Sequence, residues 1–260
     1  MIELLEGLPN ITAFLLILVR VSAFFIAMPF FSYRTIPTVQ RIGIAAFLSY
    51  IMYFTLDIGA LEVNGEYILL ILKEAMVGLG IGLFAAIIMS AIQMAGGFID
   101  FQMGFAIANV IDPQTGAQSP LLGQFFNVMS FLLLLSLNGH HLLLDGIFYS
   151  YQFIPMDSGL NFGSEAFVGQ IMKTFGAVFA IAFQMSIPVV ACLFLVDLAL
   201  GIIARTVPQL NIFVVGFPIK IGVSFIVLFI MMGVMIAVMK NLFEFMIVSM
   251  RDLMMILGGG

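Results

Sequence analysis

Residues 96–105 read Gly-Gly-Phe-Ile-Asp-Phe-Gln-Met-Gly-Phe, and the polar, Gly- and Pro-containing passage that they open continues to Pro120. Long apolar runs stand on both sides of it. In hydrocarbon every unpaired backbone N–H or C=O group is costly, so a broken segment at membrane depth is tolerated only where protein buries it or water reaches it. We expect this stretch to line or close a passage if it lies at membrane depth, and to be an ordinary loop if it lies outside.

The composition places the whole chain in a membrane. Its 260 residues are 63% hydrophobic and 9% charged, and its mean hydropathy is +1.21. Soluble domains carry about 25% charged residues, so this chain has to be solvated by lipid or by other apolar chains. The net charge of -5 gives no support to nucleic-acid binding. We therefore predict an all-α integral membrane protein.

Six apolar runs approach or exceed the roughly 20 residues that a membrane helix needs. They cover residues 8–31, 42–56, 67–95, 121–144, 166–204 and 216–239. We expect some of these helical segments to be broken. The second is short for a full span and could be half-buried in protein, and the fifth is too long for one perpendicular span, with Pro188 as a candidate kink. An apolar tail follows the sixth, and residues 258–260 should be frayed.

The charges outside the runs predict an orientation. Arg34 and Arg41 share one connection and Arg205 lies in another, whereas the connections at 57–66 and 145–165 are acidic. If all six runs are conventional spans, the positive-inside rule places the basic connections and residues 96–120 on the cytoplasmic side.

An enzyme is not expected. His140, His141 and Asp145 could suggest a metal site, but no third cluster completes it. The single cysteine, Cys192, excludes a disulfide framework and a Cys-based metal site. Phosphate-binding loops, nucleophile elbows and intramembrane protease motifs are also absent from the sequence. We therefore expect no catalytic residue, no metal and no cofactor.

Ionisable groups inside apolar runs are costly and are functional candidates by default. They are Arg20, Lys73, Glu74, Asp100, Asp112, Asp197, Arg205 and Lys220. Neighbours on a helix point about 100° apart, so Lys73 and Glu74 should each pair elsewhere. Asp197 and Arg205 share a face but lie two turns apart, too far for a direct bridge. We favour pairing with neighbouring helices that fixes assembly over a proton relay.

Two further groups are set apart by their positions. Gly78 and Gly82 have the spacing that lets another helix approach closely. Met103 and Phe105 lie in the central stretch and are candidates to line a gate, because flexible thioethers can repack around a variable guest.

The motifs resemble a known family. They are residues 100–105 with Asp112-Pro113 and Pro120-Leu121-Leu122, then Asn138-Gly139-His140, Ser150 with Pro155, and Val207–Lys220, which reads Val-Pro-Gln-Leu-Asn-Ile-Phe-Val-Val-Gly-Phe-Pro-Ile-Lys. This pattern is similar to the FliR/SpaR/YscT family, the R component of the export gate in type III secretion. The resemblance covers about residues 20–240. The motif at residues 211–218, Asn-Ile-Phe-Val-Val-Gly-Phe-Pro, has a flagellar form.

The resemblance implies a function. Such proteins are not enzymes; one copy assembles with P and Q components (FliP and FliQ) into a helical gate that passes unfolded flagellar subunits. It also implies contacts with the B component that switches specificity (FlhB), the A component (FlhA) and membrane lipid, in the flagellar basal body of the bacterial inner membrane. Residues 1–165 would be a P-like unit and residues 166–260 a Q-like hairpin with the apolar tail.

In relatives the loop after the third helix plugs the closed channel. The resemblance places this plug at about residues 104–119, and the expected plug or gate residues are Met103, Gly104, Phe105, Ile107, Asn109, Val110, Asp112, Pro113, Gln114, Thr115 and Gly116. The charges named above, Asp112 excepted, are expected to fix assembly. Pro208 and Pro218, like Gly78 and Gly82, are expected at helix contacts.

Two other classes stay open. The first is a secondary transporter or ion channel, in which a broken helix with Asp100, Asp197 and Arg205 would form an ion site at mid-membrane. Against it, the two halves show no obvious repeat. The second is a structural membrane scaffold, in which the central stretch has no role in permeability.

Overall fold

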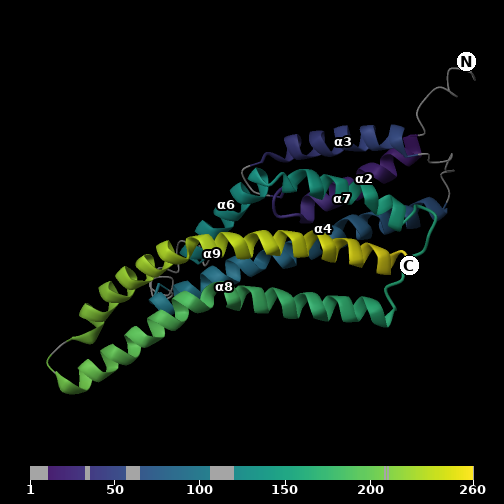
Figure 1. Cartoon of the computed structure of the whole chain (residues 1–260). Coiled ribbons are helices and arrows are strands. Elements are labelled where there is room, and N and C mark those ends of the chain that lie inside the picture. The colour runs from purple at the N-terminus through teal and green to yellow at the C-terminus, as the bar shows by residue number, and fades with distance from the viewer. Residues whose placement is uncertain are drawn as a thin grey trace, which may run out of the picture. The chain divides into compact units, whose positions relative to one another are not determined.

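The described part of the chain is helical. The computed structural model describes residues 11–32, 36–56, 65–105, 120–207, 209 and 211–259. Within these ranges seven helices and no strand are formed (Figure 1): α2 (Ile11–Ala27), α3 (Thr38–Thr55), α4 (Gly65–Met103), α6 (Leu121–Ser136), α7 (Gly139–Phe153), α8 (Glu165–Thr206) and α9 (Ile212–Leu257). The predicted all-α fold of a membrane protein is confirmed.

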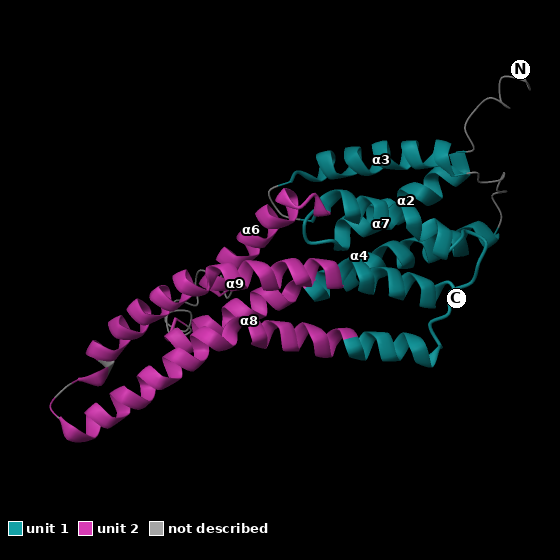
Figure 2. Ribbon diagram, viewed as in Figure 1, with its two compact units in different colours: residues 1–88, 140–173, 246–260 teal, residues 89–139, 174–245 magenta. Residues whose placement is uncertain are grey.

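The chain divides into two compact units, which Figure 2 shows in two colours. Unit 1 holds residues 1–88, 140–173 and 246–260, and unit 2 holds residues 89–139 and 174–245. The helices α4, α8 and α9 each contribute one part to each unit. The predicted division into residues 1–165 and 166–260 concerns likeness to partner proteins, which packing within this chain does not test, so it stays a prediction.

Three of the described helices are long and apolar enough to cross a membrane. They are α4, α8 and α9, with 39, 42 and 46 residues. At about 1.5 Å per residue each is roughly 60–70 Å long, twice the ~30 Å of a hydrocarbon core. The pair α6 and α7 is the one further candidate among the described residues, as a single broken span. Six conventional spans are thus not found there, and the predicted orientation, which assumed them, stays a prediction.

Three apolar runs end differently from their sequence predictions. The third continues as helix to Met103, so the stretch beginning at Gly96 is not broken until after that residue. The fourth is two helices bent by 76° at residues 137–138, where Asn138 has a positive φ of 56°. Asn tolerates this left-handed conformation better than most residues, which explains the break. The sixth includes the tail, because α9 reaches Leu257.

The core of unit 1 forms where α4 approaches α2. A Cβ added to Gly78 would lie 2.1 Å from the carbonyl oxygen of Arg20, and one added to Gly82 would lie 2.9 Å from that of Phe24. The two glycines therefore let the backbones of these helices approach closely, and large side chains such as Phe24 and Phe25 are buried beside them.

The helix α3 packs on α2 through a narrow face. Its buried residues are Ala45, Ser49 and Met52, and α2 and α3 are neighbours in unit 1. Large side chains elsewhere on α3, including Phe47 and Phe54, are exposed. The second apolar run is thus only partly buried within the chain.

Candidate functional site

Asp100 holds both ends of the segment 106–119. Its backbone carbonyl accepts a hydrogen bond from the backbone N–H of Phe105, at 3.0 Å. Its carboxylate accepts another from the backbone N–H of Leu122, also at 3.0 Å. The second bond satisfies one of the free N–H groups at the start of α6 and places a negative charge at that positive helix end. One buried residue of α4 thus fixes the last residues before the segment and the first helical turn after it.

Two glycines bring α4 and α6 together at the same place. A Cβ added to Gly96 would lie 2.3 Å from the Cα of Gly123 and 2.4 Å from its nitrogen. A Cβ on Gly123 would meet the carbonyl oxygen of Gln93 and the ring of Pro120, each at 3.1 Å. Backbone meets backbone here, so neither helix has room for a side chain, and glycine inside α4 has a packing reason.

The end of α4 also rests on α9. Gly104 has a φ of 89°, which favours glycine, and the ring of Phe217 lies 3.2 Å from where its Cβ would be. Phe105 and Phe217 form an edge-to-face pair with ring centroids 6.4 Å apart. Met103 is completely buried. The residues that precede the segment 106–119 are therefore packed against α9.

A polar chain of three side chains joins α4 to the hairpin of α8 and α9. The side-chain amide of Gln102 donates a hydrogen bond to Asp197 Oδ2, at 2.9 Å. Lys220 Nζ forms an ion pair with Asp197 Oδ1. Asp197 thus receives one partner on each oxygen, from two different helices. The pair is partly buried, with side-chain exposures of 37% for Asp197 and 22% for Lys220, so water does not screen it fully.

The register of the hairpin explains why Asp197 meets Lys220. Gly216 lies against Leu200, where an added Cβ would be 3.0 Å from the leucine Cδ1. Asp197 lies about one turn before Leu200 and Lys220 about one turn after Gly216, so two antiparallel helices in contact at Leu200 and Gly216 bring the charges together. A cleft of about 300 Å³ beside them is lined by Met103, Gly104, Asp197, Leu200, Gly216, Phe217 and Lys220, among others.

Unit 1 contains a second buried polar cluster, centred on Arg20 of α2. The guanidinium donates to both oxygens of Glu74 in α4, one of them at 2.9 Å from Nη2. It also donates to Ser150 Oγ at 3.0 Å and lies 3.7 Å from the centre of the Tyr151 ring. Both charged side chains have no exposed surface. Such a pair survives burial only when further hydrogen bonds satisfy its remaining atoms, as these do.

Two cations hold the end of α7 and the turn that follows it. Arg20 Nη2 donates to the carbonyl of Ile154 at 2.9 Å. Lys73 Nζ donates to the carbonyls of Pro155 and Met156, the latter at 2.9 Å. The carbonyl of Ile154 closes the helix end, where carbonyl groups carry partial negative charge and are stabilised by cations, whereas those of Pro155 and Met156 belong to the turn beyond it. Lys73 and Glu74 thus serve different partners.

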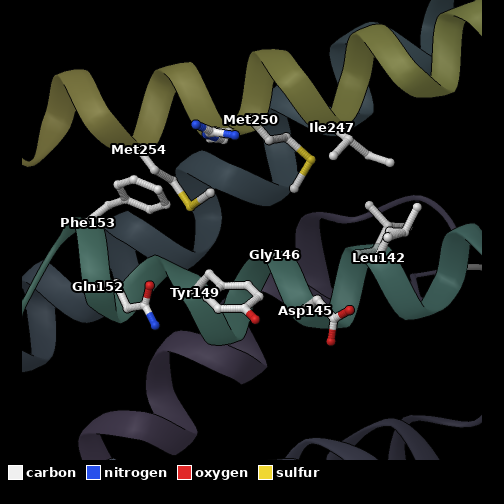
Figure 3. Close-up of a pocket in the computed structure, with 11 residues that line it drawn as sticks. Leu142, Asp145, Gly146, Tyr149, Gln152, Phe153, Ile247, Met250 and Met254 are labelled. Atoms are coloured by element: carbon white, nitrogen blue, oxygen red, sulfur yellow. The ribbon is translucent and has the colours of Figure 1, made fainter.

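A pocket of about 350 Å³ lies between α7 and the end of α9 in unit 1. Figure 3 shows Met250 and Met254 of α9 on one side of it and Tyr149 and Phe153 of α7 on the other. Gly146 is part of its lining, and an added Cβ would meet the Met250 methyl group at 3.8 Å, an ordinary van der Waals contact. The lining is mainly apolar.

The remaining predicted residues are distributed as follows. Ile107, Asn109, Val110, Asp112, Pro113, Gln114, Thr115, Gly116 and Pro208 lie outside the described residues. Pro218 lies inside α9. Arg205 is in the last turn of α8 and is exposed. The rings of His140 and His141 are tilted by 38° to each other, with centroids 4.1 Å apart. The described residues contain no group of three or more metal-binding side chains.

The ion site of the transporter alternative is not assembled in the described residues. It requires Asp100, Asp197 and Arg205 to act together. Asp100 instead accepts a hydrogen bond from the first turn of α6, and Asp197 pairs with Lys220. Arg205 is exposed.

Comparison with known proteins decides the family. The model of the family described as bacterial export proteins, family 1, matches residues 11–246. This chain belongs to that family.

The export-family chain is similar to several curated relatives. It is 58% identical to the flagellar biosynthetic protein FliR of Bacillus subtilis, over 95% of this chain and 96% of the relative. It is 27% identical to FliR of Escherichia coli, over 87% of each chain. The Yop proteins translocation protein T of Yersinia pestis is 30% identical over 82% of this chain and 83% of its own length. The predicted FliR/SpaR/YscT resemblance is confirmed. The family and the flagellar relatives support a membrane-embedded component of a flagellar export apparatus, which is not an enzyme.

The sequence assigned no individual role to several residues of the export-family chain that make these contacts, although four of them lie in the quoted motifs. They are Gln102, Leu122, Gly96, Gly123, Tyr151 and Phe217. A signal for one contact was available, because Asp197 and Lys220 are nearly equidistant from the turn between two long helices. Leu122 acts through its backbone, which no residue-type argument can identify.

Proposed function

We propose that this chain is the R component of a flagellar type III export gate, and that its segment 106–119 closes the channel through which unfolded flagellar subunits leave. The carrying observation is the double hold of Asp100 on the two ends of that segment. A closing element has to be fixed at its ends while its middle remains free to be displaced, and Asp100 supplies the fixed ends.

The side chains around these ends suit this role. Met103 and Phe217 border the cleft beside the end of α4. Methionine and phenylalanine make an apolar seal that adapts to different guests, because the thioether is flexible and neither side chain forms obligatory hydrogen bonds. Gly104 provides backbone freedom at the point where the chain leaves α4.

The apolar surface supports partners. In the most apolar stretch of 18 residues in each helix, only 17% of the stretch is buried within the chain for α8 and for α9, against 56% for α4. Because these helices are about twice as long as the hydrocarbon is thick, lipid alone cannot cover them. The remainder requires apolar companion chains. We propose FliP and FliQ as these companions, FlhB and FlhA as further contacts, and the bacterial inner membrane as the site.

Within this assembly we propose that residues 1–165 take a P-like place and residues 166–260 a Q-like place. The hairpin of α8 and α9, which accounts for most of the second part, supports this assignment. Native mass spectrometry of the gently extracted protein tests the partners. One copy bound to several different small membrane proteins is expected, and a chain that stays alone or forms a homodimer would contradict the proposal.

Deletion of Ile107–Gln118 tests the closing role. We expect the deletion variant to assemble with its partners and to leak ions through the membrane. The matched control replaces the same residues by a Gly/Ser segment of equal length, which keeps the spacing of the ends. Assembly with unchanged conductance in the deletion variant would refute a closing role.

A further inference from the structure

We infer that Gln102, Asp197 and Lys220 form a latch that holds residues 102–105, the root of the closing segment, on the hairpin of α8 and α9. The inference rests on the proposed function and adds to it the contact that has to open. Gln102 lies three residues before Phe105, the last described residue before the segment 106–119. Its side-chain amide donates a hydrogen bond to Asp197, whose other carboxylate oxygen pairs with Lys220.

The chemistry of the three groups fits a contact that can open. Asp197 is the shared acceptor, and a carboxylate accepts a donor on each oxygen. Its bond to Lys220 lies within the hairpin, whereas its bond to Gln102 reaches out to α4. Release of Gln102 therefore leaves the Asp197 charge still paired with Lys220. The root can separate from the hairpin without stranding a charge in apolar surroundings, which would be costly.

The surroundings allow the root to move. The cleft of about 300 Å³ next to the latch is bordered by Met103 and Gly104 of the root and by Asp197 and Lys220 of the latch. The other contact between root and hairpin, Phe105 with Phe217, is an edge-to-face ring pair. A polar bond and a ring pair then separate together when the root leaves the hairpin.

The role of Lys220 is to position Asp197. Without its ammonium group, the carboxylate would face the cleft with only the Gln102 amide as partner. Pro218 precedes Lys220 by two residues in α9, and Gly216 brings this part of α9 against α8. The hairpin thus presents the carboxylate to α4 at a fixed place. The hydrogen bond from Gln102 to Asp197 is the one that breaks when the root separates from the hairpin.

The test uses the assembled complex, isolated with its partners and measured for ion conductance in planar bilayers and for subunit secretion in cells. Gln102→Leu removes the donor but keeps the ion pair. A charge-assisted hydrogen bond has about a tenfold or larger effect on an equilibrium. We expect Q102L complexes to assemble and to conduct about tenfold more while closed. Gln184→Leu is the matched control, because Gln184 is an exposed glutamine of α8, and it should conduct as the parent does.

A charge exchange supplies the second arm. Lys220→Asp alone should leak, because it sets a second carboxylate against Asp197 and drives that side chain from its place. Asp197→Lys combined with Lys220→Asp should restore closure, because the exchanged pair forms again and the lysine at position 197 can donate to the carbonyl of the Gln102 amide. A double variant as leaky as the single one, or Q102L complexes as tight as Q184L complexes, would overturn the latch. Leakage of the 107–118 deletion beside tight Q102L complexes would refute the latch alone, and a tight deletion variant would refute the closing segment itself.

A crosslink keeps the inference testable if Q102L does not assemble. Cysteines at Phe105 and Phe217, in a Cys192→Ala background, can be joined by a short reducible bis-maleimide. We expect the joined protein to stop secreting subunits and to resume after reduction, whereas the single Phe217→Cys variant should be unaffected by the reagent. Undiminished secretion by the joined protein would show that the root does not leave the hairpin.

Discussion

The carboxylate of Asp100 accepts a hydrogen bond from the backbone amide of Leu122, 22 residues further along the chain. The same residue's carbonyl accepts the amide of Phe105. Its side chain is therefore as much a part of α6 as of α4. The residues on both sides of the segment 106–119 are therefore held at one place, by Asp100.

Replacement of Asp100 should loosen the start of α6. Asp100→Ala removes an N-terminal cap, for which a loss of about 0.5–2 kcal/mol is typical. Asp100→Asn keeps an acceptor and loses only the charge, so its effect should be smaller. Hydrogen–deuterium exchange of residues 121–124 measures the difference. Equal protection of these amides in the D100A variant and the parent would contradict the assigned cap.

The glycines of α4 should differ sharply in their tolerance of alanine. Gly78→Ala and Gly82→Ala place a methyl group against the backbone of α2, whereas Gly80 has nothing within 4 Å. We expect the first two variants to be destabilised by at least about 1–3 kcal/mol, the usual cost of overpacking. Gly80→Ala should be neutral or slightly stabilising, because alanine favours helix. Thermal aggregation of the detergent-solubilised proteins measures this, and equal midpoints for the three variants would refute close packing at Gly78 and Gly82.

Removal of one charge from the buried pair in unit 1 should cost more than removal of both. Arg20→Met or Glu74→Gln leaves a charge or a donor unpaired where both side chains have no exposed surface, and about 3–5 kcal/mol is expected. The double variant R20M/E74Q should recover part of this. Arg20→Lys should not rescue, because an ammonium group cannot donate to both oxygens of Glu74 and to Ser150 in the same geometry. The amount of each variant that accumulates in the membrane provides the measurement. A double variant that accumulates no better than either single variant would contradict the pairing.

The break between α6 and α7 should depend on the residue at position 138. Asn138 has a φ of 56°, so Asn138→Gly should be tolerated and Asn138→Val should be destabilising by about 1–2 kcal/mol. The thermal midpoints of the two purified variants provide the comparison. A valine variant as stable as the glycine variant would show that the bend of 76° does not need the left-handed conformation.

Sequence reasoning worked best where composition alone decides. Helical runs in an apolar chain follow from hydrophobicity, and the all-α membrane fold was predicted on that basis. It was less successful where a boundary depends on tertiary contact. The helix α4 continues through Gly96 and Gly97 because Gly96 meets the backbone of Gly123, a contact between residues 27 positions apart by number. A propensity argument at Gly96 sees only two helix-disfavouring residues.

The charged residues show the same division. Their cost in apolar surroundings singled out Arg20, Glu74, Asp197 and Lys220, and neighbour geometry indicated that Lys73 and Glu74 serve different partners. Which residue pairs with which depends on the register of helices far apart in sequence. The pair of Arg20 and Glu74 spans 54 positions, and no local pattern encodes that distance.

The double hold of Asp100 has a consequence for the history of such chains. A segment whose two ends are fixed by one residue can be lengthened, shortened or exchanged without a change in the helices that carry it, because loop length costs little once its ends are set. The segment 106–119 is then a cassette. Selection can alter its sequence while the scaffold that presents it stays constant.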